Sequence, residues 1–168
     1  AMALVRREVP EAACVIIGDA SDIAYQDRLR RIIAARDLAD HVRILGRVLD
    51  DVLLGWYHTA DIFALPSVNV GGAFEGFGLV YLEAGAAGLP VIGTTGCGAE
   101  EAIDDGLTGF LVPQHDPAAL AGAILRLLQD PDLRARMGAA GRAKAQAHTW
   151  TQVAAQVQEA YAAALAGG

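Results

Sequence analysis

Several features that would mark a specialised class of protein are scarce in this sequence. It contains only two cysteines, Cys14 in a Val/Ile-rich run and Cys97 in a glycine-rich loop, too few for a disulfide framework and without metal-ligand spacing. No apolar run reaches the roughly 20 residues that a membrane-spanning helix needs, and the sequence does not open with a charged and then apolar secretory leader. We therefore expect reduced thiols and a cytoplasmic location, and a peripheral membrane location of a longer enzyme stays open.

Clustered positive charge is also missing. The formal net charge is −7, and the 13 basic and 20 acidic residues are spread along the chain. Nucleic-acid binding requires a clustered Lys/Arg surface, so we expect no nucleic-acid partner. The four histidines lack the spacing of a metal site or a catalytic triad, so we predict neither a metal nor a cofactor; they are His41, His58, His115 and His148.

What the sequence does contain is one domain's worth of alternating strand and helix patterns. The 168 residues, 54% of them hydrophobic, fit a single domain over 1–168. Short apolar runs occur at 13–18, 42–46, 61–66, 90–93 and 109–112. Segments with helical spacing separate them. This order predicts an α/β fold, an open parallel sheet of Rossmann type with helices on both faces.

The predicted helices carry recognisable start and stop signals. Segments 22–38 and 50–60 are expected to begin at an aspartate N-cap, and Asp116-Pro117 and Asp130-Pro131 repeat a start signal of a capping Asp followed by Pro. Further helices are expected at 2–9, at 79–87 with its end at Gly88, and at 151–165. The last one has an apolar stripe that we expect to pack against something, formed by Val153, Val157, Tyr161 and Leu165.

The chemistry is expected where the strands end, because ligands of open α/β sheets bind outside the carboxyl ends of the strands. The longest such loop covers 67–78 and ends with Glu75, Gly76, Phe77 and Gly78. Its glycines let backbone N–H groups approach a ligand, and the following helix start at Leu79 offers unpaired N–H groups to a phosphate. Glu75 and Glu83 flank this point, and carboxylates accept hydrogen bonds from sugar and ribose hydroxyls. The pattern suggests a nucleotide-diphosphate sugar lying across the loop.

Three segments make the sequence recognisable. They are Phe74 to Leu79 continuing through Glu83-Ala84, Gly88 to Ile92, and Gly106 to Val112. Together they resemble the C-terminal, donor-binding domain of retaining GT-B glycosyltransferases of family 4, the group 1 glycosyl transferases. The resemblance covers nearly the whole chain, and the order of Gly18-Asp19, Gly46-Arg47-Val48 and the paired glutamates is that of the family.

The resemblance implies an enzyme that transfers a hexosyl unit from a UDP- or GDP-type sugar to a sugar, lipid or glycan acceptor. It implies that Glu75 lies beside the donor sugar as the candidate catalytic residue, that Gly76 to Leu79 contact sugar and phosphates, and that Glu83 holds the ribose. Arg47 and Val48 would flank the base, and Gly18 and Asp19 would line the donor site. Two alternatives stay open for single residues: Asp19 could instead cap the following helix, and Arg47 could be a surface side chain. The Gly96-Cys97-Gly98 segment is interpreted as a tight turn near the donor.

The sequence also departs from the family pattern. The family's domain usually opens with a strand that ends in a Gly-Arg loop near a lysine, a cationic clamp on the diphosphate, and the first helix here corresponds to the segment after it. An N-terminal acceptor domain is likewise expected as a separate partner. We therefore expect unpaired strand edges, self-association through them as an option, and no sugar transfer by the 168 residues alone.

Two other functional classes stay open. One is a dinucleotide-binding domain of an oxidoreductase, which the fold could host. Against it, the first strand ends in Gly18-Asp19-Ala20-Ser21 and not in Gly-x-Gly-x-x-Gly, and Gly76-Phe77-Gly78 lacks the third glycine. The other is a nucleotide-sugar-binding module without turnover. The base, the sugar and the acceptor are not specified by these residues.

Overall fold

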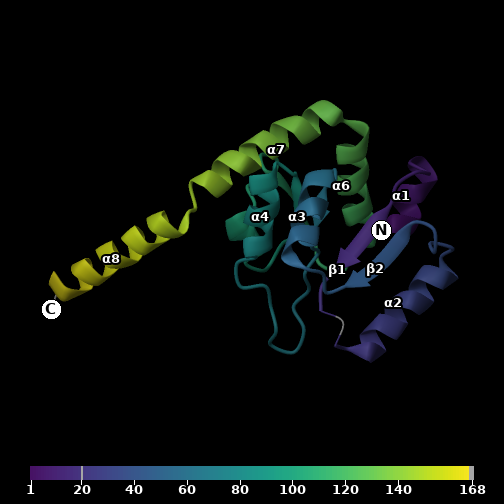
Figure 1. The fold of residues 1–168 in the computed structure, drawn as a ribbon, viewed down its shortest axis with the longest axis horizontal. Coiled ribbons are helices and arrows are strands. Elements are labelled where there is room, and N and C mark those ends of the chain that lie inside the picture. The colour runs from purple at the N-terminus through teal and green to yellow at the C-terminus, as the bar shows by residue number, and fades with distance from the viewer. Residues whose placement is uncertain (20, 167–168) are drawn as a thin grey trace.

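The computed structural model describes residues 1–19 and 21–166, in which strands and helices alternate as the sequence predicts (Figure 1). The strands are β1 (Cys14–Ile17), β2 (Val42–Gly46), β3 (Phe63–Ala64), β4 (Val91–Thr94) and β5 (Gly109–Val112). The helices are α1 (Met2–Glu8), α2 (Ile23–Ala35), α3 (Asp50–Thr59), α4 (Leu79–Ala87), α5 (Ala99–Ala102), α6 (Pro117–Gln129), α7 (Pro131–Gln146) and α8 (Trp150–Ala166). Each run that was expected to be a strand overlaps one, although β3 is only two residues long and β4 extends one residue past the expected run.

The strands form two parallel sheets where the sequence predicted one. β1 pairs with β2, with a shift in register between Ile16 and Ile17. β3, β4 and β5 form the second sheet in that order. β1 and β3 are not hydrogen-bonded to each other, so within the described strands each has one unpaired edge. The expectation of unpaired edges is therefore confirmed, and the sheet is divided at that point.

The three-stranded sheet has a hydrophobic core on each face. Successive residues of β4 point to opposite faces, as the strand pleat requires. Val91 belongs to a buried cluster with Tyr57, Tyr81 and Ala99, from α3, α4 and α5. Ile92 belongs to a second buried cluster, formed with β5, α6 and α7 by Phe110, Val112, Leu127, Leu133 and Met137. Helices therefore cover both faces, and the predicted α/β fold class is confirmed.

The helix starts follow the predicted capping signals with one exception. Asp22 accepts a hydrogen bond from the Tyr25 backbone N–H at 2.9 Å, and Asp116 and Asp130 cap α6 and α7 in the same way. The prediction for Asp50 is wrong, because Leu49 is the N-cap and has no side-chain bond. Asp50 lies in the first turn instead, where its charge interacts favourably with the helix dipole.

The last helix differs from the prediction. We expected the stripe of Val153, Val157, Tyr161 and Leu165 to be packed, yet no residue of α8 is buried in the described structure. Leu165 is 85% exposed. Figure 1 shows the reason, since α8 extends away from the α/β layers. None of the helices within residues 1–19 and 21–166 is long and apolar enough to cross a membrane.

Candidate functional site

The long loop after β3 is anchored at its base and ends in a tight hairpin. Val70 and Ala73 exchange two backbone hydrogen bonds of 3.0 and 2.9 Å across Gly71 and Gly72. Both glycines have positive φ, 56° and 86°, as a two-residue hairpin turn requires. The predicted loop 67–78 is therefore an ordered segment that projects from the sheet, visible between α4 and β1 in Figure 1.

An amide network holds the base of this loop against its neighbours. The Asn69 backbone N–H donates to Gln114 Oε1 at 2.8 Å, and Asn69 Nδ2 donates to the Gly96 carbonyl at 2.9 Å. Gln114 Nε2 in turn donates to the Thr95 carbonyl at 2.9 Å. The loops that follow β3, β4 and β5 are thus joined at the carboxyl edge of one sheet, which is where the sequence places the chemistry.

The Gly96–Cys97–Gly98 segment supports the loop directly beneath Glu75. Gly96 has φ 75°, as expected for a tight turn. The Gly98 N–H donates to the Glu75 carbonyl oxygen at 2.8 Å. The Cys97 thiol donates to the Thr94 carbonyl at 3.3 Å, which gives it a structural contact within the turn.

Helix α4 begins immediately after this loop, with its first turn partly exposed. Its N-cap is Gly78, with φ 80°, a conformation that glycine adopts without strain. The N–H groups of Leu79 and Val80 have no acceptor within the helix, because the first turn of any helix leaves its N–H groups unpaired. Leu79 is 51% exposed and Val80 is half-buried, whereas the N-cap Gly78 is buried, so part of this turn faces solvent. Gly76 is exposed and Phe77 packs against the core below.

Tyr81 fixes the start of α4 to the end of β3. Its side chain is buried, and its hydroxyl donates to the Leu65 carbonyl at 2.6 Å. Burial raises the pKa of the Tyr81 hydroxyl to about 12. The hydroxyl therefore remains a donor throughout the neutral range, and the first turn of α4 is held in place.

The two glutamates of the predicted site differ in their surroundings. Glu75 is half-buried, and its carboxylate has no hydrogen bond or ion pair with any described residue. Glu83 is exposed and accepts a hydrogen bond at Oε2 from the Tyr57 hydroxyl at 3.1 Å. No cation of the described chain pairs with Glu83 either, which argues against a purely structural ion pair. Both carboxylates can accept hydrogen bonds from a ligand.

The remaining predicted residues lie at the end of the two-stranded sheet. The Gly18 N–H donates to the Gly46 carbonyl at 3.1 Å, so the loop of Gly18 and Asp19 lies beside the loop of Arg47 and Val48. Asp19 accepts hydrogen bonds from the Ser21 N–H and hydroxyl. The cap of α2 is Asp22, so the alternative that Asp19 caps this helix is wrong. Arg47 is exposed and Val48 is half-buried. The predicted site residues thus form two groups, one on each sheet.

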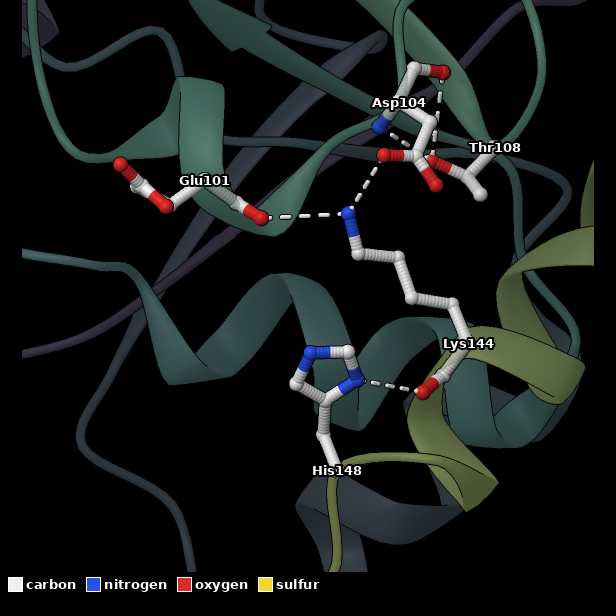
Figure 2. Close-up of polar contacts among 5 residues, drawn as sticks. All are labelled: Glu101, Asp104, Thr108, Lys144 and His148. Carbon is white, nitrogen blue, oxygen red and sulfur yellow. Dashed lines mark hydrogen bonds and ion pairs between the residues drawn. The ribbon is translucent and has the colours of Figure 1, made fainter. Parts of the chain in front are cut away.

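The only lysine of the sequence makes a tertiary contact that the sequence analysis missed (Figure 2). Lys144 Nζ lies 2.7 Å from Asp104 Oδ1 and donates to the Glu101 carbonyl at 3.1 Å. Asp104 in turn accepts at its carbonyl from Thr108 Oγ1 and donates its N–H to the same hydroxyl. Lys144 therefore joins α7 to the end of α5, the helix that begins beside Gly98.

Sequence reasoning also missed the positioning roles of Tyr57, Asn69 and Gln114. Tyr57 carried a signal, because its helical spacing with Leu53 placed it on the apolar face of α3. Asn69 and Gln114 carried none, since they are 45 residues apart and meet only through the fold. Within the described ranges, no group of three or more His, Cys, Asp or Glu residues could hold a metal ion.

This arrangement of loops, with two carboxylates at a helix start on a parallel sheet, agrees with the comparisons with known proteins. The family described as "Glycosyl transferases group 1" matches residues 1–144. The chain belongs to this family, and its recognition as the C-terminal domain of a GT-B glycosyltransferase is confirmed.

Two curated relatives illustrate the match. A D-inositol 3-phosphate glycosyltransferase of Streptomyces scabiei is 41% identical over 145 residues, 86% of this chain and 31% of the relative. A GDP-mannose-dependent alpha-(1-6)-phosphatidylinositol monomannoside mannosyltransferase of Mycobacterium tuberculosis is 38% identical over 162 residues, 95% of this chain and 41% of the relative. The chain thus spans about a third of the length of the curated relatives that it matches.

Solved structures give the same result for the fold. Sucrose-phosphate synthase from Thermosynechococcus elongatus superposes with a TM-score of 0.83 at 30% identity, covering 99% of this chain and 42% of that one. Anabaena Alr3699/HepE in complex with UDP-glucose superposes with a TM-score of 0.81 at 26% identity, covering 96% of this chain and 44% of that one.

Proposed function

We propose that this chain is the donor-binding domain of a retaining glycosyltransferase and that it binds a nucleotide-diphosphate sugar at the start of α4. The observation that carries the proposal is the position of Glu75 and Glu83, one on each side of a partly exposed helix start, in a chain that belongs to a glycosyltransferase family. In the whole enzyme, a hexosyl unit would pass from this donor to a sugar, lipid or glycan acceptor.

The first turn of α4 is the proposed diphosphate site. It combines unpaired N–H groups with the positive end of a helix dipole, which together favour an anion. The nine-residue helix also follows a loop whose backbone is exposed at Gly76. The only lysine is engaged with Asp104, so we propose that backbone N–H groups supply this contact, and we expect the binding to be weak.

Each carboxylate has a proposed partner on the donor. Glu75 would accept hydrogen bonds from the hydroxyls of the sugar ring, because its carboxylate, which has no hydrogen bond to a described residue, would lie next to the diphosphate. Glu83, one turn into the helix, would accept from the ribose hydroxyls. The base would lie toward the loop of Arg47 and Val48, and the loop of Gly18 and Asp19 would close the same side.

Two similar proteins suggest which nucleotide sugars to consider as the donor. The Mycobacterium tuberculosis relative is named as GDP-mannose-dependent, and the Anabaena structure was solved with UDP-glucose. Both donors contain a ribose, a diphosphate and a hexose, and the proposed site would contact each of these three parts. We propose a UDP- or GDP-linked hexose for this chain on that shared chemistry.

Nuclear magnetic resonance titration of the 168-residue chain tests the proposal. UDP, GDP, uridine, guanosine and NAD would be added separately to isotope-labelled protein. We expect UDP or GDP to shift the amide signals of Gly78, Leu79 and Val80, with weaker effects from the matching nucleoside, because the diphosphate supplies the anion. Binding of NAD in preference to both diphosphates, or shifts confined to residues away from α4, would contradict the proposal.

A further inference from the structure

The orientation of the Glu83 carboxylate depends on a single protein contact. Glu83 is exposed on α4, and its hydrogen bond from Tyr57 is the only polar contact of its side chain with a described residue. A surface glutamate without a partner samples several rotamers, and ordering it on binding costs conformational entropy. The Tyr57 hydroxyl removes part of that cost by holding Oε2 in one place before any ligand arrives.

Tyr57 is itself held rigidly. Its side chain is 8% exposed and belongs to the buried cluster between α3, α4 and β4. Its ring packs against Phe63 with the centroids 5.9 Å apart, and Phe63 packs against Tyr81 in an edge-on arrangement at the same separation. The hydroxyl therefore lies at a fixed point on the rim of the core and reaches Glu83 from the neighbouring helix.

The hydrogen bond has one direction at neutral pH. Burial, followed by the charge of Glu83, raises the pKa of the Tyr57 hydroxyl to about 12. The phenol is thus a donor and the carboxylate an acceptor. Because Tyr57 is neutral, it orients Glu83 and leaves the negative charge of the carboxylate intact. A lysine or arginine in its place would cancel that charge.

The contact leaves acceptor capacity for a ligand. A carboxylate has two oxygens and about four lone-pair sites, and Tyr57 occupies one site on Oε2. Oε1 has no protein donor among the described residues. Two neighbouring hydroxyls of a ribose could both donate to the sites that remain.

We propose that Tyr57 is a positioning residue for ribose recognition, holding the Glu83 carboxylate so that it accepts hydrogen bonds from the ribose hydroxyls of the nucleotide. This inference rests on the proposed function, because it assumes that a nucleotide binds at α4. It assigns a role in ligand binding to a residue that touches no ligand.

The test compares ribonucleotides with deoxyribonucleotides. Dissociation constants for UDP or GDP and for the corresponding deoxy compounds lacking a ribose hydroxyl are measured by titration of the 168-residue chain. For the unaltered protein we expect the ribonucleotide to bind roughly ten- to hundredfold more tightly, the range of one hydrogen bond to a charged acceptor. Tyr57→Phe keeps the ring and its packing but loses the hydroxyl, so it should lower the ratio of the deoxyribonucleotide to the ribonucleotide dissociation constant roughly two- to fivefold, which is the part of the ordering cost that the hydroxyl removes.

Two further variants separate positioning from general destabilisation. Glu83→Ala should abolish the ratio, since it removes the acceptor. Tyr81→Phe removes another buried hydroxyl, the one bonded to Leu65, and should leave the ratio unchanged even if overall affinity falls.

An unchanged ratio in Tyr57→Phe would show that Tyr57 only packs and would overturn the inference alone. Equal binding of ribo- and deoxyribonucleotides by the unaltered protein would also overturn it, whereas failure of every nucleotide to bind would overturn the proposed function itself.

Discussion

Gly138 of α7 lies directly against the backbone of Gly88, the residue that ends α4. A Cβ atom on Gly138 would be 2.0 Å from the Gly88 carbonyl oxygen. Gly88 has φ 88°, and the Arg142 guanidinium donates to the neighbouring Ala87 carbonyl at 3.1 Å. The end of α4 is thus fixed by the close approach of two backbones, which only a glycine at 138 permits.

Gly138→Ala should therefore destabilise the domain. We expect the free energy of unfolding to fall by about 3 kcal/mol, the upper part of the range for overpacking, because the atom in the way belongs to the backbone and cannot rotate aside. Denaturant unfolding measures it. The matched control is Gly122→Ala in the exposed part of α6, where no heavy atom of the described structure is within 4 Å of a new Cβ. That change should be neutral or stabilising by up to about 1 kcal/mol, and equal losses in both variants would contradict the argument.

Gly98→Ala should displace the loop that carries Glu75. A Cβ on Gly98 would be 2.0 Å from the Gly76 carbonyl oxygen and 2.6 Å from the Phe77 nitrogen. The Glu75–Phe77 backbone must then move, and a displacement of about 1 Å can cost up to about a hundredfold in a precisely positioned site. We expect the affinity for UDP or GDP to fall by roughly ten- to hundredfold.

Titration calorimetry checks this, with Gly55→Ala as the control, because a Cβ there has no described neighbour within 4 Å. Nucleotide affinity unchanged by Gly98→Ala would place the binding site elsewhere.

Lys144→Met should weaken the contact between α7 and the end of α5. The lysine side chain is 13% exposed, but the Asp104 side chain is 49% exposed, so solvent screens the ion pair. We expect a loss of about 1–2 kcal/mol in the free energy of unfolding, mostly from the hydrogen bonds of a charged donor. Thermal or denaturant unfolding measures it. The control is Arg30→Met, which breaks an exposed pair with Asp27 and should cost less than about 0.5 kcal/mol. Equal effects of the two changes would show that the Lys144 contact is no stronger than a surface pair.

The stability of the domain should fall in alkaline solution. Burial raises the pKa of both Tyr57 and Tyr81 from 10.0 to about 12. Between these values the unfolded chain has lost the phenol protons that the folded chain still binds, so the free energy of unfolding decreases as pH rises from about 10 to about 12. The contribution of these two groups is fully present below pH 10.

Denaturant unfolding at a series of alkaline pH values tests the sign. The double variant Tyr57→Phe with Tyr81→Phe should start from a lower stability, since it lacks two hydrogen bonds, but should lose less of it across this range. A slope as steep in the double variant as in the unaltered protein would assign the effect to other groups.

The sequence by itself determined the elements and their order. β-branched runs, capping aspartates followed by proline and the Gly88 stop are local signals, and each acts on backbone conformation within a few residues. The pairing of Glu75 and Glu83 around a helix start was readable for the same reason, because both lie within one turn-and-helix segment. Asp50 shows the limit of local signals, since adjacent positions compete for the cap and the helix began one residue earlier.

Only the tertiary structure decided how these segments meet. The division into two sheets, the exposed stripe of α8 and the contacts from Tyr57 to Glu83 and from Lys144 to Asp104 all join residues that are far apart in the chain or depend on what packs beside them. An apolar stripe indicates that a helix can bury one face. Whether another surface packs against that face depends on the tertiary fold. Gly98 and Gly138 are further examples. Each must be glycine because the backbone of a distant segment lies where a Cβ atom would be, and no local sequence pattern reveals that contact.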